Sequence, residues 1–243
     1  MTAGPTTVVY TCITGGYDTL RSPSVVDPGL HYVAFVTRDQ PGAGVWELRH
    51  IDIDARLGPV KTARRAKVLA HEVLSEFDRS IWIDGNIDVH GDALAPFERW
   101  PGEPLLAFRH PKRRCTYDEG RAVVALGKET REVVERQLER YRVEGYPRGR
   151  GMIESNVLLR DHRDQDVRRL MERWWFEIEH GSARDQLSFD YSAWATGVAY
   201  ATMGESHSRG TSDAFRMRSG HSRRRSWRER VRRLLAKLRD PSL

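Results

Sequence analysis

The sequence has few cysteines and no long apolar run, and both scarcities narrow the class of protein. Only two of its 243 residues are cysteine, Cys12 and Cys115, and their separation matches no paired zinc-ligand spacing. We therefore expect neither a disulfide framework nor a zinc site, and a reducing compartment is the simpler assumption. No basic residue precedes the first apolar run, and no apolar stretch reaches about 18 residues, so we expect neither a signal peptide nor a membrane-spanning helix.

Most of the chain has no excess of positive charge, because the net charge of +6 comes from the last 22 residues. Residues 222–243 hold nine Lys or Arg and two acidic residues, a local charge of +7, so the rest is close to neutral. One helical face of this tail carries Trp227, Val231, Leu234, Leu235 and Leu238. This pattern is typical of an amphipathic helix on an anionic membrane. Docking on a protein surface and a nucleic-acid arm are the alternatives.

The length favours one sizeable domain with an appendage. Strand-like and helix-like segments alternate without an internal repeat, which predicts an α/β fold with a mostly parallel sheet. We assign residues 1–203 to this domain. Residues 204–221, rich in Gly, Ser, Arg and His, are assigned to a flexible linker or lid, and residues 222–243 to a basic amphipathic tail helix.

Hydrophobic periodicity gives the individual elements. Expected strands cover residues 6–14, 31–37, 45–53, 80–89, 105–108 and 152–160. Expected helices cover residues 61–77, 117–126, 130–143 and 164–180, the last with the strongest apolar stripe. Ligands of open α/β sheets bind beyond the strand ends, so polar residues at those ends are the candidate site.

Residues 80–89, SIWIDGNIDV, carry the strongest functional signal. Read as one extended strand, the stretch places its polar and apolar residues on opposite faces. The first of these faces holds Trp82, Asp84, Asn86 and Asp88. Oxygen ligands on one face suit a hard divalent cation, and Gly85 lets the backbone bend or a ligand approach. We interpret the stretch as a strand end opening into a site, and a solvated edge strand is the alternative.

Basic groups recur on one helix and after one strand. Arg64, Lys67 and His71 form a stripe at helical spacing, which neutralises a diphosphate if it faces the ligand edge and is merely solvated if it faces water. The basic residues within 109–114 follow a strand end, where they are better placed to bind an anionic substrate than basic residues in the middle of a helix. Asp185 follows the 164–180 helix, where it either caps a turn or has a catalytic or acceptor-binding role.

Six blocks of sequence together resemble the turgor-regulation and mucilage-related (TOD/MUCI) glycosyltransferase-like family. They are YTCITGGYD at 10–18, RRAKVLAHEVL at 64–74, SIWIDGNIDV at 80–89, FRHPKRRCTYDEG at 108–120, IESNVLLR at 153–160, and WW followed by RDQLSFDY at 184–191. The resemblance covers about residues 7–200 and leaves the tail outside. It implies a GT-A-type, Rossmann-like α/β/α sandwich that binds a nucleotide sugar at the carboxyl ends of its strands.

The resemblance also implies a donor site. Asp84-Gly85-Asn86 stands where that superfold has Asp-X-Asp, whose carboxylates hold manganese or magnesium against the diphosphate. The neutral Asn86 weakens this set unless another residue completes it. The candidate metal ligands are Asp84, Asn86, Asp88 and His207. The candidate donor-binding residues are Thr14, Gly15, Gly16, Tyr17, Asp18, Arg64, Lys67, Asp84 and Gly85.

Sugar transfer requires groups that stabilise the negative charge on the leaving diphosphate, and an inverting reaction also requires a base. The departing diphosphate becomes more negative, and a cation on Asp84, together with Lys67 and Arg109, would stabilise it. For an inverting reaction Asp185 or Glu154 would deprotonate the acceptor hydroxyl, whereas a retaining reaction needs no base there. The candidate acceptor-binding residues are His110, Arg113, Tyr117, Arg184 and Gln186.

We therefore expect a transferase that moves sugar from a nucleotide-sugar donor to a glycan or lipid-linked acceptor in cell-surface polysaccharide or glycolipid synthesis. Its tail would hold it peripherally at the inner, cytoplasmic face of a membrane, and nucleic acid is not an expected partner. One alternative is a metal-dependent hydrolase of a membrane lipid that uses Asp84 to activate water. Another is a non-catalytic module whose basic tail binds nucleic acid or an acidic polymer.

Overall fold

A seven-stranded sheet forms the centre of the computed structural model, which describes residues 4–16, 18–40, 43–205, 212–218 and 234. Its strands are β1 (Thr7–Ile13), β2 (His31–Val36), β3 (Glu47–His50), β4 (Arg79–Ile83), β6 (Leu105–Arg109), β7 (Ile153–Asp161) and β8 (Ala201–Glu205). Their order across the sheet is β3-β2-β1-β4-β7-β6-β8, and β7 alone runs antiparallel to its neighbours. The expected α/β fold with a mostly parallel sheet is confirmed.

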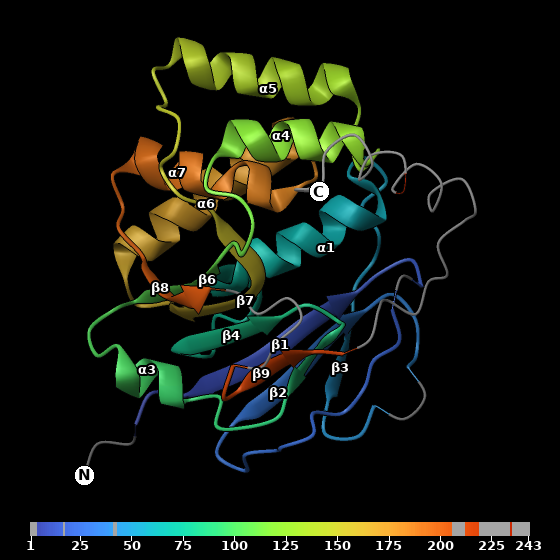
Figure 1. Cartoon of the computed structure of the whole chain (residues 1–243). Coiled ribbons are helices and arrows are strands. Elements are labelled where there is room, and N and C mark those ends of the chain that lie inside the picture. The colour runs from blue at the N-terminus through green and yellow to red at the C-terminus, as the bar shows by residue number, and fades with distance from the viewer. Residues whose placement is uncertain (1–3, 17, 41–42, 206–211, 219–233, 235–243) are drawn as a thin grey trace.

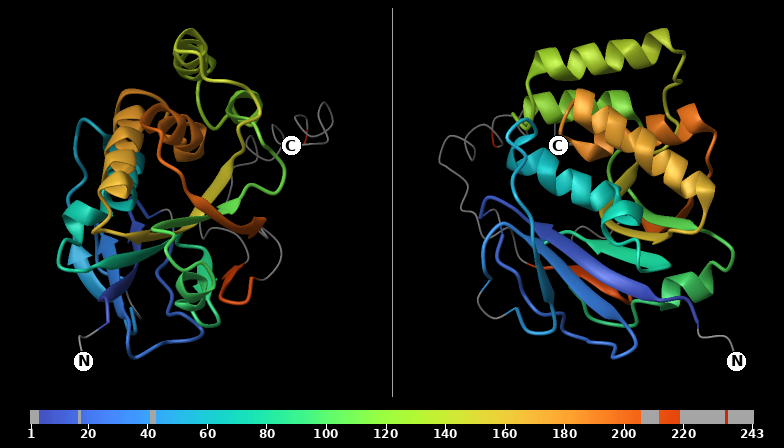
Figure 2. Two further views of the ribbon diagram at one scale, coloured as in Figure 1. Left: turned by 90° about the vertical axis from the view of Figure 1, so that its left-hand side faces the viewer. Right: turned by 180° about the vertical axis from the view of Figure 1, so that it is seen from behind.

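Helices cover one face of this sheet in two layers (Figure 1). The inner layer holds α1 (Gly58–Val68), α2 (Ala70–Val73), α6 (Gln165–His180), the short 3₁₀ turn η1 (Asp185–Leu187) and α7 (Phe189–Thr196). The outer layer holds α4 (Thr116–Ala125) and α5 (Arg131–Val143), with α5 outermost (Figure 2). The opposite face carries α3 (Ala95–Arg99) and a two-stranded ribbon of β5 (Ile87–Val89) and β9 (Phe215–Met217).

Three hydrophobic clusters hold these layers together. The first lies between the sheet and the inner helices and includes Tyr10, Trp82 and the fully buried Trp174 of α6. The second lies on the opposite face, under α3 and the β5–β9 ribbon. The third joins α4 and α5 to α7. The parallel strands β1, β2 and β4 are buried on both faces, and their sequences are largely apolar, as such strands require.

The apolar stripe of the 164–180 segment and its first residue correctly predict α6. The Asp164 carboxylate caps this helix by accepting a hydrogen bond from the Val167 amide at 2.9 Å. The Thr130 hydroxyl similarly caps α5. Each such cap stabilises a helix by about 1 kcal/mol. Among the described residues, no helix combines the length and apolar character needed to cross a membrane.

Two expected elements are interrupted in the structure. The 61–77 segment is not one helix, because α1 ends at Val68 and the short α2 follows after Leu69, whose backbone (φ −91°, ψ 45°) is not helical. The 80–89 segment is not one strand. The Ile87 amide donates to the Asp84 carbonyl at 2.8 Å, which closes a turn between β4 and β5. The two strands on either side of this turn belong to different sheets.

The region expected to be a linker or lid contains regular structure. Gly204 and Glu205 end β8, and Phe215–Met217 form β9, which pairs antiparallel with β5. This pairing explains the difference, because a three-residue strand has too little sequence for a two-residue repeat to be recognised. The expected tail helix at 222–243 lies outside the described residues, apart from Leu234.

Candidate active site

The candidate site lies at the edge of the sheet where the parallel strands end. β1 and β4 are neighbours there, although the chain passes from β1 to β2 on the other side, so this is a topological switch point. Open α/β sheets bind ligands in the crevice beyond the carboxyl ends of strands at such a point. Because β7 is antiparallel, its first residues reach the same edge.

Lys67, on the last turn of α1, is the centre of a buried polar cluster. Its side chain is only 1% exposed. The Nζ atom lies 2.6 Å from Asp185 Oδ2, 3.0 Å from Ser155 Oγ and 3.5 Å from Asp84 Oδ1. The ammonium also lies 5.3 Å from the centre of the Trp82 ring, a cation–π distance. Lys67 thus joins residues of α1, β4, β7 and η1, and it is too enclosed here to contact a ligand directly.

The end of α1 is itself fixed by two buried side chains. The Tyr10 hydroxyl donates to the Lys67 carbonyl at 2.6 Å, and Arg160 Nη1 donates to the carbonyls of Lys67 and Val68. A cation at the carboxyl end of a helix also interacts favourably with the helix dipole. These bonds use carbonyls that the helix leaves unpaired, and they hold Lys67 in place.

Asp185 is the buried counter-ion of two cations. Burial alone would raise the pKa of its carboxyl, but Arg64, Lys67 and Arg184 outweigh this effect and hold the pKa far below its usual range. Arg64 Nη1 lies 3.5 Å from Asp185 Oδ2, and the Arg64 side chain keeps 19% of its surface exposed. Burial lowers the pKa of Lys67, against the effect of Asp185 and Asp84. Of the two cations that contact Asp185, Arg64 is therefore more accessible than Lys67.

An irregularity in β7 brings Ser155 into this cluster. The register between β6 and β7 shifts between Ala107, which faces Leu158, and Phe108, which faces Glu154. Such bulges re-aim side chains beside active sites. The Ser155 hydroxyl donates to Asp185 Oδ2 at 2.9 Å. Ser155 was not expected as a site residue, because a bulge is not visible in hydrophobic periodicity.

Asp84 is the first residue of the turn after β4. Its Oδ1 atom accepts a hydrogen bond from Trp82 Nε1 at 2.9 Å and faces Lys67. Both contacts use Oδ1, so among the described residues Oδ2 is left for another ligand. A Cβ atom on Gly85 would stand 3.3 Å from Asp18 Oδ2, so the Asp18 carboxylate packs against this turn from the β1 side.

These two carboxylates fit one kind of divalent cation site. Among the described residues no three His, Cys, Asp or Glu side chains gather as a complete metal cage. Magnesium-type ions need no such cage, because one or two carboxylates and substrate phosphates hold them. Asp84 and Asp18 are the two carboxylates that border this turn and could serve such an ion, and Asn86 stays a predicted ligand.

Asp88 has a different role from the one expected, because its carboxylate is already occupied. It is 1% exposed and accepts hydrogen bonds from Ser24, Arg216 and Arg218. Burial would raise its pKa, but the hydrogen bonds from these residues lower it to about 2. The strand alternation that placed Asp88 beside Asp84 does not apply across the turn. His207 lies outside the described residues.

The loop after β1 packs against the start of α1. The Thr14 hydroxyl donates to the Pro59 carbonyl at 2.8 Å, which ties the strand end to the helix. Gly15 and Gly16 both have positive φ, at 60° and 65°, which favours glycine. A Cβ on Gly16 would stand 2.8 Å from Arg38 Nη2. This loop therefore borders the switch point, while Tyr17 lies outside the described residues.

Arg109 and Glu154 lie farther along the same edge. Arg109 ends β6, two strands or roughly 10 Å from β4, and its Nη2 atom lies 3.4 Å from Thr202 Oγ1. Glu154 pairs with Phe108 across β6 and β7. Since Ser155 faces the helices, strand alternation turns Glu154 to the other face of the sheet. Neither residue joins the Lys67 cluster.

Three of the expected acceptor-binding residues lie in the turn into α4 or in its first turn. His110 Nδ1 accepts hydrogen bonds from the Lys112 and Arg113 amides. Burial, and to a smaller extent the positive charge of Arg113, lowers the pKa of His110 to about 4. Arg113 pairs with the buried Glu119. The Tyr117 hydroxyl donates to the Tyr146 carbonyl at 2.6 Å inside the third cluster. These contacts give all three side chains a structural role.

The other two expected acceptor-binding residues flank Asp185. The Arg184 amide donates to Ser182 Oγ, and the Arg184 charge helps to lower the pKa of Asp185. Gln186 Nε2 donates to the Ile153 carbonyl at 3.3 Å, which ties η1 to the start of β7. Asp185 itself does not cap α7, because the structure shows no side-chain cap there. The capping interpretation of Asp185 is therefore wrong.

Asp190 is a buried carboxylate that the sequence did not single out. Burial raises its pKa to about 6, against hydrogen bonds from the Tyr200 hydroxyl and the Ile153 amide. It borders a cavity of about 470 Å³ that Arg150 and Trp194 also line. In the sequence, Asp190 is distinguished only by lying in the 184–191 block that resembles the family. Its raised pKa depends on burial, which the sequence does not reveal.

The fold and the acidic turn at its switch point define a Rossmann-like α/β protein of glycosyltransferase type. Residues 1–203 match the TOD1/MUCI70, glycosyltransferase-like domain, and the chain belongs to that family. It is also 30% identical over 135 residues to the probable hexosyltransferase MUCI70 of Arabidopsis thaliana. That alignment covers 51% of this chain and 23% of the relative, so it represents less than a quarter of the relative's length.

Proposed function

We propose that this chain transfers a sugar from a nucleotide-sugar donor to a glycan or lipid-linked acceptor. The observation that carries the proposal is the meeting of Lys67, Asp185 and Asp84 at the switch point of a glycosyltransferase-like fold. The relationship to a probable hexosyltransferase supports a hexose as the transferred group. Cell-surface polysaccharide or glycolipid synthesis is the process we propose for it.

The donor diphosphate binds between the β1 loop and the Asp84 turn in this proposal. Arg64 contacts the diphosphate, since its side chain is partly exposed and the buried Asp185 holds it in place. A manganese or magnesium ion held by Asp84 and Asp18 supplies further positive charge when bound. Together these groups stabilise the negative charge that develops on the leaving diphosphate.

Lys67 and Asp185 act behind these groups in the proposal. The Lys67 ammonium fixes Oδ1 of Asp84, so Oδ2 keeps one orientation for the metal. Asp185 neutralises the two cations, and its strongly lowered pKa makes it a poor proton acceptor. We therefore propose that Asp185 positions Lys67 and Arg64 instead of acting as the base. Arg109 as a stabiliser of the leaving diphosphate and Glu154 as the alternative base stay predictions.

We also propose that residues 222–243 attach the protein peripherally to the inner face of a membrane. The support is the composition of this segment, which combines nine basic residues with an apolar stripe. A role in nucleic-acid binding would leave the stripe without a function. The attachment would bring the site close to a lipid-linked acceptor.

Product analysis distinguishes the proposed sugar transfer from the alternative function, hydrolysis of a membrane lipid. Purified protein is incubated with a panel of nucleotide sugars and manganese, with and without glycan acceptors, and products are separated by chromatography. We expect release of nucleoside diphosphate that an acceptor accelerates, together with a glycosylated product. Cleavage of a membrane lipid without any nucleotide sugar would instead support the hydrolase.

A further inference from the structure

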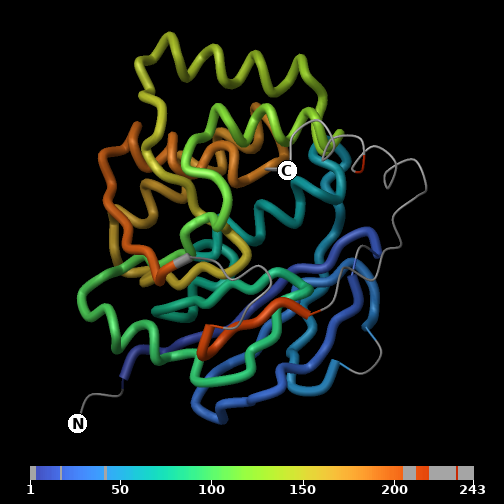
Figure 3. Tube along the Cα trace, in the orientation of Figure 1, coloured from blue at the N-terminus to red at the C-terminus, as the bar shows by residue number. Residues whose placement is uncertain are grey.

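The Asp84 turn is contacted by a segment that lies outside the matched family domain. The domain match ends at residue 203, whereas residues 212–218 return to the site side of the molecule. Figure 3 shows this orange-red segment running beside the green trace of β5. We call residues 212–218 the clasp. It pairs with β5 immediately after the turn, so its position bears directly on the donor site.

Backbone contacts run along the whole clasp. Its last residue, Arg218, donates its amide hydrogen to the Asn86 carbonyl at 2.8 Å, within the turn itself. At its other end the His90 amide donates to the Ala214 carbonyl at 2.9 Å. A Cβ on Gly91 would stand 2.1 Å from the Asp213 carbonyl oxygen, so only glycine permits this approach. The clasp therefore follows the chain from Asn86 to Gly91 without a gap.

A buried carboxylate, Asp88, fastens the clasp next to the turn through two partly exposed arginines. Asp88 Oδ2 accepts hydrogen bonds from Arg216 Nε at 3.0 Å and Nη2 at 2.9 Å, and Arg218 binds Oδ1. The Ser24 amide and hydroxyl donate to the same carboxylate. Arg218 also donates to the Ser22 carbonyl at 2.6 Å. A carboxylate with five donors is strongly fixed, and it lies only four residues from Asp84.

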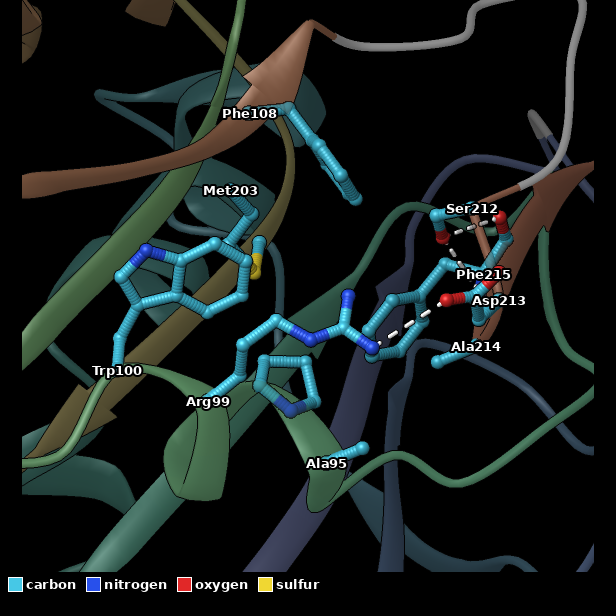
Figure 4. A pocket seen from close by; sticks show the side chains of 10 residues that line it. Ala95, Arg99, Trp100, Phe108, Met203, Ser212, Asp213, Ala214 and Phe215 are labelled. Atoms are coloured by element: carbon cyan, nitrogen blue, oxygen red, sulfur yellow. Dashed lines mark hydrogen bonds and ion pairs between the residues drawn. The ribbon is translucent and has the colours of Figure 1, made fainter.

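The ion pair at the far end of the clasp is weaker than the one at the turn. Asp213 pairs with Arg99 of α3 at 3.3 Å, and both side chains are largely exposed. Figure 4 shows this pair at the border of a small cavity of about 40 Å³, which Phe215 and Trp100 also line. Exposed pairs contribute little to stability. The two ends of one segment thus offer a strong contact at the turn and a weak contact away from it.

We propose that the clasp sets the shape of the Asp84–Gly85–Asn86 turn and that Arg218 is a positioning residue of the donor site. It acts on Asn86 through its backbone and on Asp88 through its guanidinium. The proposal rests on the proposed donor site at Asp84. It implies that residues beyond the matched domain are required for full affinity toward a nucleoside diphosphate.

The test compares Arg218→Gln with Arg99→Gln, which breaks the exposed pair with Asp213 at the other end and a cation–π contact with Trp100. Calorimetry measures binding of uridine, guanosine and adenosine diphosphates with manganese. Loss of a positioning partner typically weakens such a site about 10-fold or more, so we expect that change for Arg218→Gln and none for Arg99→Gln. Arg218→Lys, which keeps a cation, should recover part of the affinity. Equal affinity in all variants would overturn the proposal.

Hydrogen exchange separates this proposal from the proposed function. The Ile87 amide is hydrogen-bonded to the Asp84 carbonyl within the turn, and we expect its exchange in Arg218→Gln to accelerate by more than the change in global stability, measured by urea unfolding, accounts for. This result holds even if no diphosphate binds to the wild type, an outcome that would contradict the proposed function alone. If Arg218→Gln does not fold, Arg216→Gln takes its place. Unchanged exchange at the turn would refute the positioning role.

Discussion

Lys67 and Asp185 are 118 positions apart in the sequence, and their charged groups meet at 2.6 Å behind the carboxyl edge of the sheet. The contact joins the end of α1 to η1, and Ser155 and Asp84 complete it. A buried ion pair costs desolvation energy and is weak evidence for stability. Its place beside the acidic turn therefore points to function. The pair fixes a carboxylate that a ligand can use.

Removing the cation of this pair should destabilise the fold. Lys67→Met removes the nearest cation from the buried Asp185 and leaves it only Arg64 at 3.5 Å and the Ser155 hydroxyl, which costs about 3–5 kcal/mol in the free energy of unfolding. The double variant Lys67→Met/Asp185→Leu should recover part of this loss, because no charge then stays buried without a partner. Urea unfolding measures both. As a control, Arg131→Met breaks the exposed pair with Glu135 and should cost less than about 1 kcal/mol.

Asp190 should make stability depend on pH in a defined direction. Its folded pKa of about 6 lies above the usual 3.8, so the folded state binds the proton more tightly. The stability it contributes is present below pH 4 and is lost as pH rises toward 6, by up to about 3 kcal/mol. Urea unfolding of wild type and Asp190→Asn at pH 4 and pH 7 measures the difference. Parallel pH profiles for the two proteins would rule out this titration.

Metal binding should require the carboxylates on both sides of Gly85. With a nucleoside diphosphate present, manganese at 100 times its dissociation constant should raise the melting temperature of the wild type by roughly 5–10 °C. We expect Asp18→Asn and Asp84→Asn to lose most of this increase, and EDTA to abolish it in the wild type. Asp39→Asn, at an exposed site, serves as the control. An increase that survives in Asp18→Asn would exclude that carboxylate as a ligand.

Deletion of residues 222–243 should separate membrane attachment from folding. The shortened protein should lose binding to vesicles containing phosphatidylserine, because each basic residue near an anionic surface contributes about 1 kcal/mol. Its melting temperature should change little. Sedimentation with anionic and neutral vesicles makes the comparison. Equal sedimentation of both proteins with the anionic vesicles would contradict the attachment.

Periodicity and local signals predicted most of the fold. β1, β2, β6, β7 and α4 to α6 lie close to their expected ranges, because each has a regular apolar pattern or a capping residue such as Asp164. The break at Leu69 and the turn at Asp84 were missed. Both depend on long-range bonds, since Arg160 binds the end of α1 and the Asp84 amide donates to the Asn156 carbonyl. Tertiary contacts of this kind have no signature in a short window.

The candidate site was only partly predictable for the same reason. Arg64, Lys67, Asp84 and Asp185 were all named from their patterns, and the structure brings them together. Asp88 was grouped with Asp84 by a two-residue repeat that ends at the turn. Its true partners, Arg216 and Arg218, are about 130 residues away. No local rule connects residues at that distance, and the same is true of Asp18 and Gly85.

The most direct test of the account is nucleotide-sugar turnover by wild type and Asp84→Asn. Release of nucleoside diphosphate is followed for the donor that product analysis identifies, and urea unfolding shows whether the variant is folded. Since Asp84 is proposed to hold the cation that stabilises the leaving group, we expect turnover to fall about 100-fold or more with the fold intact. Unchanged turnover in a folded Asp84→Asn protein would contradict the central assignment.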